Sequence, residues 1–532
     1  MRSIRLCRRI AGKFFQGCRE QNKGRGVYPL EGEKQAFMKL DRSGCCFRAV
    51  QCVISIVFLF AAAPAWCDSL PFISSNTSSG PSVPFNAPAS IMKPKASESL
   101  TASAIPEQLK NLQNLSLEEV INIALEYNPI TKAAWRQARA AAGQLNVSRS
   151  LYYPSITVNG EFNRYQSDFV GTPIKVLDTT YGLSASVDYL LFNFGGRYSQ
   201  VQEAKYALLV ADLSQNSTIQ NMILEVEQAY YQYLGAKAMY DAALKSLEDA
   251  KTNLEAAQER NSNGLATIAD VLQAKANYSQ AQLTVESTNG QIQITQGGLV
   301  TAMGIPANIQ VSVGSLPEHV NVPEIKKTID GLMKEAEEHR PDLAAARAQA
   351  LQAQTHVNTV LASGLPSLVA NGTVSRTYLY TPPSNPYYDQ WSTGIQLQIP
   401  LFNGFSTAYG VFAAKEQAKA ARQQLENVKQ QVSFQVWSSY YTLKTAQQQL
   451  VTSEDFLTSA QQSEEVALGR YREGVGDILS LLNAQTTLAS ARAQEVQARA
   501  NWFIAMAQLA YDTGVLTPEY LNQKISVIKG SK

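Results

Sequence analysis

The side chains best suited to chemistry are unevenly placed along this 532-residue chain. Cysteine and histidine supply most protein ligands for zinc, and cysteine is also a strong nucleophile. All six cysteines stand within the first 67 residues, as Cys7, Cys18, Cys45, Cys46, Cys52 and Cys67. The three histidines, His319, His339 and His356, show no metal-ligand spacing. We therefore expect no cysteine-based zinc site, cysteine nucleophile or disulfide framework after Cys67.

Sequence motifs for catalysis are missing as well. The sequence contains no GxSxG, HExxH or P-loop motif, and its carboxylates do not pair at a distinctive spacing. After residue 67 the chain holds 34 Lys and Arg against 40 Asp and Glu, whereas nucleic-acid-binding domains are usually basic. We predict that the protein is not an enzyme, needs no cofactor or metal, and binds no nucleic acid.

The N-terminal region has the pattern of an export signal. Residues 49–63 form a short apolar run, with basic residues before it and a small-residue cleavage pattern after it. Residues 1–67 are therefore expected to be an N-terminal extension plus a signal peptide, with Met38 as the true start. The mature chain would begin near Asp68, and the Ser/Pro-rich residues 68–111 would form a flexible arm.

An internal repeat organises the rest of the chain. Motifs recur at an offset of 212 or 210 residues: Asn128-Pro129 matches Arg340-Pro341, Leu191-Phe192-Asn193 matches Leu401-Phe402-Asn403, and Arg260 and Gly264 match Arg470 and Gly474. Such a steady offset predicts a duplicated fold. We expect a first repeat over 112–322, a second over 323–516, and a C-terminal tail over 517–532.

Each repeat alternates apolar and polar residues where it should form a β-hairpin. The expected strands are 154–165, 181–190, 366–378 and 391–399, with turns at 166–179 and 381–388. Each is close to the roughly 9–11 residues that a tilted transmembrane strand needs. On the last strand, Trp391, Ile395 and Leu397 are the better candidates for a lipid-facing side.

The remaining segments of each repeat are predicted to be helical. Two long helices are expected at 197–262 and 406–472, and four shorter ones at 129–150, 265–303, 341–363 and 475–512. A capping box of Ser116 and Glu119 predicts a further helix start. Two short helices nearly equal one long helix in length, so we expect them to stack end to end beside it. An ordinary coiled coil would explain the small apolar seam of the long helices equally well.

Four strands are too few to close a membrane barrel, because single-chain barrels begin at about eight strands. Unpaired strand edges in lipid are very costly. The expected fold is a mixed α/β membrane protein, internally duplicated, whose strands share one β-barrel with other copies and lead into a long helical barrel.

The repeated motifs carry a family resemblance. The Asn-Pro helix starts, the LFN corners and the turns at 260–274 and 470–484 resemble the TolC-like outer-membrane efflux proteins over roughly residues 112–516. The resemblance implies a β-barrel shared by a homotrimer, four strands per chain, continued by an α-helical coiled-coil barrel across the periplasm. It implies outer-membrane lipid, a periplasmic adaptor (membrane fusion) protein and an inner-membrane transporter of RND, ABC or MFS type as partners. The implied function is a channel for efflux of small molecules or type I protein secretion.

The resemblance also indicates where the adaptor would dock. It points to the two helix-turn-helix tips, Asn263, Gly264, Leu265 and Ala266 in the first repeat, and Glu473, Gly474, Val475 and Gly476 in the second. Gly264 and Gly474 suit turns that need a positive φ, although both could be simple helix breaks.

A gate is a further implication of the resemblance. In relatives a tyrosine and an arginine bond to an aspartate on a neighbouring helix, and Asp270 and Tyr471 match two of these positions. Gly476 stands at the arginine position, so another residue such as Arg472 would have to supply that link. A solvated helix carboxylate remains the alternative interpretation of Asp270.

The pore-narrowing acidic ring of relatives is absent here, because its positions hold Ser480 and Asn483. The nearest acidic residue is Asp477. Three residues separate Asp477 from Ser480, so we expect both on one helical face. Asp477 would then move the selectivity charge toward the entrance, since rings of carboxylates favour cations.

Two other classes of protein remain open. An exported coiled-coil adhesin or structural scaffold would also have long helices and no catalytic motif. It would have no reason for two barrel-length hairpins at matching positions. An exported hydrolase is less favoured, because no motif supports it.

Overall fold

The computed structural model describes residues 114–168, 175–317, 327–380 and 383–516. The expected signal peptide, Ser/Pro-rich arm and C-terminal tail lie outside these residues. Within the described residues, no helix is long and apolar enough to cross a membrane.

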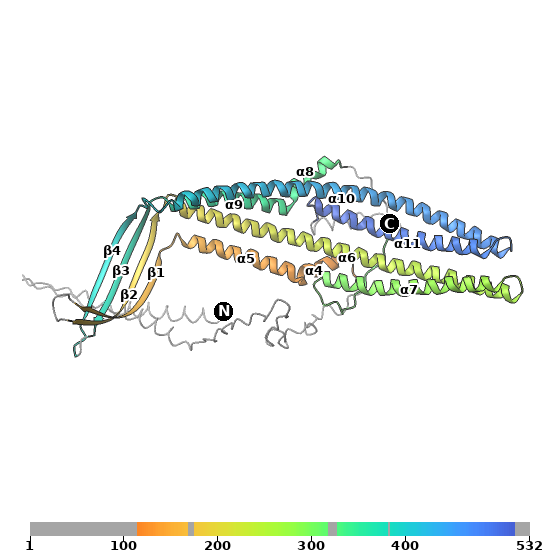
Figure 1. The fold of residues 1–532 in the computed structure, drawn as a ribbon, viewed down its shortest axis with the longest axis horizontal. Helices are drawn as coiled ribbons and strands as arrows, with labels where there is room; N and C mark the ends of the chain where they lie inside the picture. The colour runs from red at the N-terminus through yellow and green to blue at the C-terminus, as the bar shows by residue number, and fades with distance from the viewer. Residues whose placement is uncertain (1–113, 169–174, 318–326, 381–382, 517–532) are drawn as a thin grey trace, which may run out of the picture. The chain divides into compact units, whose positions relative to one another are not determined.

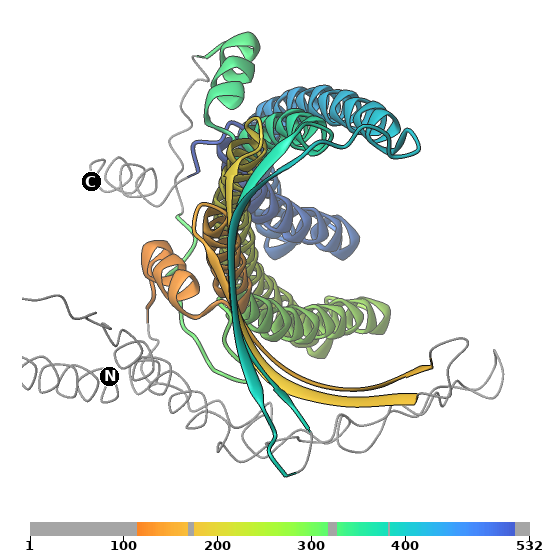
Figure 2. The ribbon, with the colours of Figure 1, turned by 90° about the vertical axis from the view of Figure 1, so that its left-hand side faces the viewer.

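Four strands form one antiparallel sheet in the order β1-β2-β3-β4. They are β1 Ser155–Asp168, β2 Lys175–Phe192, β3 Ser367–Leu379 and β4 Tyr387–Gln398. The sheet is curved and leaves β1 and β4 as its edges (Figure 2). The expected first turn at 166–179 is wrong, because both strands continue their pairing to Asp168 and Lys175. Backbone pairing does not require the apolar alternation from which the turn was predicted.

Eight described helices accompany the sheet. They are α4 Leu117–Tyr127, α5 Pro129–Ser150, α6 Gly196–Ser262, α7 Ile268–Ala302, α8 Ile329–His339, α9 Pro341–Ser363, α10 Ser406–Arg472 and α11 Ile478–Asp512. The bounds of α5, α9 and α10 match the prediction. The helices α7 and α11 begin three residues later than predicted, because Thr267 and Asp477 cap these helices and do not belong to them. The helix α8 was not predicted.

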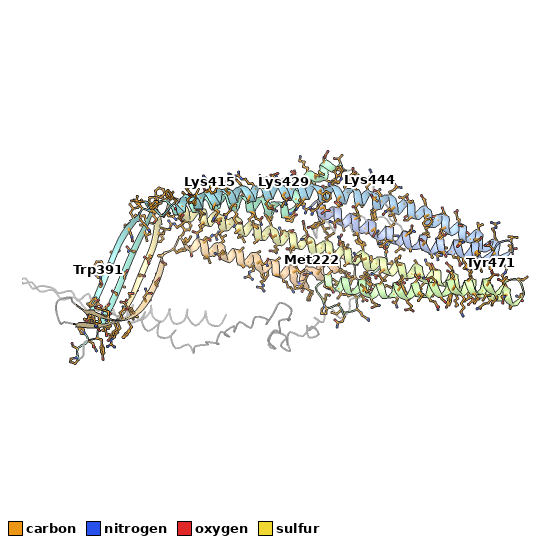
Figure 3. All side chains as sticks on the ribbon, viewed as in Figure 1. Met222, Trp391, Lys415, Lys429, Lys444 and Tyr471 are labelled. Carbon is orange, nitrogen blue, oxygen red and sulfur yellow. The ribbon has the colours of Figure 1, made fainter. Side chains whose placement is uncertain are left out.

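The short helices lie in pairs along the long ones. The helix α6 packs against α5 and α7, and α10 packs against α9 and α11. Figure 1 shows α5 and α9 on the halves near the sheet, with α7 and α11 on the halves that end at the tips. In Figure 3, Trp391 marks the sheet, Met222 the middle of the helices and Tyr471 the tips. The predicted stacking of two short helices beside one long helix is confirmed.

The largest apolar core lies where the short helices meet. It joins residues of α4, α6, α7, α10 and α11, among them Ile121, Ile223, Leu299, Met303, Leu450 and Phe503. The capping box predicted for Ser116 and Glu119 is present and starts α4. The helix α8 covers a smaller cluster, in which its Leu332 and Ala336 pack on Val432 and Val436 of α10.

The same joint is built twice in this region. The Asn128 side-chain Nδ2 donates to the Ala302 carbonyl at 2.9 Å, and the Arg340 guanidinium donates to the Asp512 carbonyl at 3.3 Å. Gly304 and Gly514 follow these carbonyls with φ of 79° and 76°. A Cβ on Gly304 would lie 2.5 Å from the Asn128 Cα. A glycine is therefore required here both by conformation and by space.

We expect Gly304→Ala to destabilise the protein by about 2–4 kcal/mol, because a left-handed backbone and a backbone clash both oppose the new methyl group. Thermal unfolding of the extracted protein measures the effect. Gly290→Ala is the matched control, since Gly290 lies within α7 and its Cβ would meet nothing within 4 Å. That change should be neutral or stabilise by about 0.5–1 kcal/mol. Equal stability of the two variants would contradict this account of the joint.

Candidate functional site

The first tip turn, between α6 and α7, is closed by backbone hydrogen bonds. Gly264 has a φ of 72°, and the Leu265 N–H donates to the Arg260 carbonyl at 2.8 Å. The Asn261 side chain donates to the Ala266 carbonyl at 2.8 Å. Asn263 is the C-cap residue of α6. This is the glycine-centred helix end that satisfies the last carbonyls of a helix.

The second tip turn, between α10 and α11, repeats this geometry. Gly474 has a φ of 76°, and the N–H groups of Val475 and Gly476 both donate to the Arg470 carbonyl at 3.0 Å. Glu473 is the C-cap residue of α10. The positive φ expected for the two tip glycines is confirmed. Each tip also presents an apolar side chain to solvent, because Leu265 is 69% exposed and Val475 is 71% exposed.

The carboxylates near the tips act as helix caps in this structure. Asp270 and Thr267 form a reciprocal capping box at the start of α7, in which the Thr267 N–H donates to Asp270 at 2.7 Å. Asp477 is the N-cap of α11 and accepts from the Ser480 N–H at 2.6 Å. Hydrogen bonds from the Ser480 side chain and, second, from this N–H hold the pKa of Asp477 below its usual range. In the first repeat the hydroxyl residue Thr267 is the N-cap and the carboxylate Asp270 stands three residues later. In the second repeat the carboxylate Asp477 is the N-cap and the hydroxyl residue Ser480 stands three residues later.

The helical position predicted for Asp477 is wrong. It was expected one turn before Ser480 on a helical face, but it stands outside the helix with an extended backbone, φ −94° and ψ 159°. An aspartate directly before a helix stabilises its free N–H groups better than it would within the helix. Ser480 and Asn483 lie exposed on α11 and carry no charge.

Tyr471 lies in a small core between the two hairpins. It is only 5% exposed and packs with Ala257, Ala274, Ile478 and Leu481. Burial raises the pKa of its hydroxyl, Arg260 opposes the rise, and Asp270 adds to it. Asp270 is thus near Tyr471, yet its hydrogen bonds go to Thr267, and the Tyr471 hydroxyl has no partner among the described residues.

The contact to Tyr471 comes from Arg260, a residue outside the predicted gate. The Arg260 Nη1 donates to the Tyr471 carbonyl at 2.6 Å, and the guanidinium carbon lies 4.7 Å from the centre of the Tyr471 ring. Arg472, the residue proposed for this link from the sequence, is exposed. The repeat pattern did pair Arg260 with Arg470, but it could not show which of the two faces the other hairpin.

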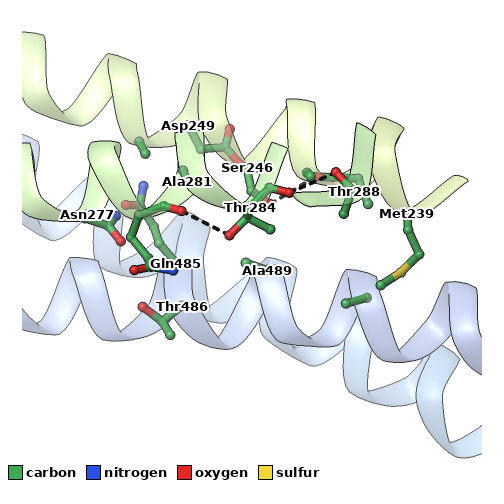
Figure 4. Close-up of a pocket in the computed structure, with 15 residues that line it drawn as sticks. Met239, Ser246, Asp249, Asn277, Ala281, Thr284, Thr288, Gln485, Thr486 and Ala489 are labelled. Atoms are coloured by element: carbon green, nitrogen blue, oxygen red, sulfur yellow. Dashed lines mark hydrogen bonds between the residues drawn. The ribbon is translucent and has the colours of Figure 1, made fainter. Parts of the chain in front are cut away.

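Above the tips, a cavity of about 250 Å³ lies between α6, α7 and α11 (Figure 4). Its polar lining includes Ser246, Asp249, Asn277, Thr284 and Gln485. Asp249 is paired with Arg492 on α11 at 2.7 Å. No group of metal-ligating side chains occurs among the described residues. The lining offers hydrogen bonds to water and polar solutes.

One face of the sheet is mainly apolar, with the ion pair of Arg376 and Asp389 at 2.6 Å beside an aromatic row, and the other face is mainly polar. Strand register places facing residues in rows that cross all four strands, and residues directly opposite share a face. One row is Phe162, Tyr181, Tyr378 and Tyr387, and others are Val158, Ala185, Val374 and Trp391, then Tyr189, Ala370 and Ile395. Tyr181 and Tyr378 stack with their ring centres 5.1 Å apart. The opposite face carries Asn159, Glu161, Ser184, Ser186, Thr373, Gln390 and Gln396.

This register resolves which side of β4 is apolar. Trp391, Ile395 and Leu397 are 76%, 70% and 60% exposed in the single chain, and all lie on the apolar face. An exposed apolar band with an aromatic row at its end has the pattern of the lipid-facing surface of an outer-membrane barrel.

Known proteins resemble this chain in sequence and in fold. The family model for "Outer membrane efflux protein" matches residues 120–305 and 332–515. Protein CyaE of Bordetella pertussis is 26% identical over 76% of this chain and 85% of its own length. Outer membrane protein TolC of Salmonella enteritidis is 24% identical over 76% of this chain and 83% of its length.

A solved structure of the outer-membrane channel OprN has the same fold. It superposes with a TM-score of 0.68 at 20% identity, over 78% of this chain and 95% of that one. The family match covers both halves of the described chain and most of its helices and strands. The chain belongs to the outer membrane efflux protein family, the TolC-like transport channels of the outer membrane, whose helical part lies in the periplasm.

Proposed function

We propose that this protein is the trimeric exit duct of a tripartite system, working with a periplasmic adaptor and an inner-membrane pump. The observation that carries this is the four-stranded sheet with an apolar face and two unpaired edges. Strand edges cannot remain unpaired in lipid, so β1 and β4 need strands from other copies. A homotrimer supplies them and closes one barrel.

The two hairpins suggest how copies join. The pairing of β1 with β2 becomes the pairing of β3 with β4 when β1 is shifted by 212 residues and β2 by 210. Under the internal duplication that we propose, over 112–322 and 323–516, the β2–β3 contact is a contact between repeats. The β4 edge would make the same contact with β1 of the next subunit.

The helices support the same contact between subunits as the strands. Within the chain, α6 of the first repeat packs against α9 and α11 of the second. The same shift would pack α10 against α5 and α7 of the partner subunit. The corresponding side of α10 is unfilled, because Phe434, Trp437 and Tyr441 are 70%, 47% and 42% exposed. A groove of about 570 Å³ lies between α10 and α11 and is lined in part by Tyr441. A helix of the partner subunit would pack into this groove.

One hydrogen bond makes the correspondence specific. The Gln220 side chain on α6 donates to the Gly514 carbonyl at 3.2 Å. Shifted by 210 residues, this becomes a bond from Gln430 on α10 to Gly304 of the partner subunit. Gln430 is exposed in the single chain, as an unfilled interface requires.

The tips are the proposed site of adaptor docking. Leu265 and Val475 stand exposed beside the turn glycines Gly264 and Gly474, at the ends of the helices farthest from the sheet (Figure 1). Six such tips in a trimer would form the periplasmic mouth. A helical adaptor could bury these apolar side chains. A pump of RND, ABC or MFS type would complete the path.

Deletion of the gene tests this function and separates its two cargo classes. Loss of an efflux duct should increase sensitivity to several unrelated drugs, whereas loss of a type I secretion duct should remove one or a few proteins from the culture medium. Complementation with the intact gene is the control. An adhesin or scaffold would change surface attachment or cell shape and neither of these readouts, and that result would contradict the proposal.

A further inference from the structure

We propose that Arg260 is the residue that ties the two helical hairpins of one chain together at their tips. It holds Tyr471 by its backbone carbonyl and the face of its ring. The tyrosine hydroxyl takes no part in this tie. This inference rests on the proposed channel function, because the tie then sets how readily the mouth opens.

The geometry of the tie joins residues that are far apart in sequence. Arg260 is in the last turn of α6, and Tyr471 is in the last turn of α10. The hydrogen bond of 2.6 Å to the Tyr471 carbonyl is charge-assisted, and helix C-terminal carbonyls favour a cation. The ring adds a cation–π contact at 4.7 Å. One guanidinium therefore binds both the end of the α10 helix and the side chain that it carries.

Arg260 also lies close to the second tip turn. The Arg260 Nη2 lies 3.8 Å from the position that a Cβ on Gly474 would take, so the guanidinium sits against the second tip turn. Its Nε is buried and has no partner among the described residues. Arg470, the counterpart on the other hairpin, is exposed. Of these two arginines, only Arg260 forms this contact within one chain.

The Tyr471 hydroxyl distinguishes this contact from the gate predicted from the sequence. It is buried and has no hydrogen-bond partner in the described part of the chain, while Asp270 is occupied by the α7 cap. Removing this hydroxyl should lose no bond, and a buried polar group without a partner is itself unfavourable. Tyr471→Phe keeps the ring and the carbonyl, and so it should keep the tie.

Any movement of the α10–α11 tip away from the α6–α7 tip must break the Arg260 contacts. A hydrogen bond to a charged group contributes about 1.5–3 kcal/mol. Its loss should therefore raise the ratio of open to closed conformations by about tenfold to a hundredfold for each subunit. Lysine could still donate to the carbonyl but could not lie flat on the ring, so Arg260→Lys should have an intermediate effect.

Single-channel recording of the full-length protein in planar bilayers tests the tie. We expect Arg260→Ala to increase the open fraction strongly and Tyr471→Phe to match the wild type. The thermal stability of each variant, measured in parallel, shows whether it is folded. A rise in open fraction with an unchanged melting transition assigns the effect to the tie.

Two results would overturn the tie alone. One is an open fraction in Arg260→Ala equal to that of the wild type. The other is Tyr471→Phe opening as strongly as Arg260→Ala, which would assign the contact to the hydroxyl. A folded protein that forms no channel in any variant would overturn the proposed function itself, and the inference with it.

Discussion

Ile395→Arg should prevent insertion of the protein into the outer membrane. Ile395 is 70% exposed on the apolar face of β4, in one row with Ala370 and Tyr189. An arginine facing lipid near the bilayer midplane costs roughly 2–4 kcal/mol, and a homotrimer would contain it three times. Membrane fractionation, with extraction of peripheral proteins by alkali, measures the inserted amount.

The neighbouring residue provides the matched control. Gln396 lies on the polar face, where it pairs with Val369 across the ladder, and its side chain points away from Ile395. Gln396→Arg introduces the same charge one residue away, and it should leave insertion almost unchanged. If both variants lose insertion equally, the added charge disturbs strand pairing, and the effect does not come from a lipid-facing side. Normal insertion of Ile395→Arg would place the lipid surface elsewhere.

Local sequence patterns predicted the elements well where a single period and a clear stop dominate. Pro129 and Pro341 begin α5 and α9, where a missing N–H costs nothing. The long proline-free stretch of α10 is one helix with the predicted bounds. The helix α8 escaped prediction because it has only 11 residues, and Leu332 and Ala336 show their pattern only against α10.

The site was harder to predict, because the contact between Arg260 and Tyr471 depends on how the two hairpins pack. Asp477 could have been recognised as an N-cap, since it precedes a helix with a serine three residues on. Arg260 could not, because Arg260 and Arg470 occupy equivalent positions in the repeat. Only the arrangement of the hairpins places Arg260 over Tyr471 and leaves Arg470 exposed in the single chain. A sequence repeat shows which positions are equivalent, but it does not show that their contacts differ within one chain.

A disulfide across the subunit boundary tests the shared barrel most directly. Within the chain, Ser186 of β2 is opposite Thr373 of β3. Shifting these residues by 210 and 212 places Gln396 of β4 opposite Glu161 on β1 of the partner subunit. Both lie on the polar face, and directly opposite residues have Cα atoms about 4.5–5.5 Å apart, within the range that a disulfide spans. The chain after residue 67 contains no cysteine of its own.

The measurement is non-reducing electrophoresis of outer membranes from a strain that expresses Glu161→Cys with Gln396→Cys. We predict covalent dimers and trimers that disappear on reduction. Each single variant should give neither. Glu161→Cys with Ser392→Cys is the off-register control, since four residues along a strand displace the partner by about 13 Å. Membrane-inserted protein that stays monomeric in the in-register pair, or cross-links equally in the off-register pair, would contradict a barrel closed by β4 against β1 of another copy.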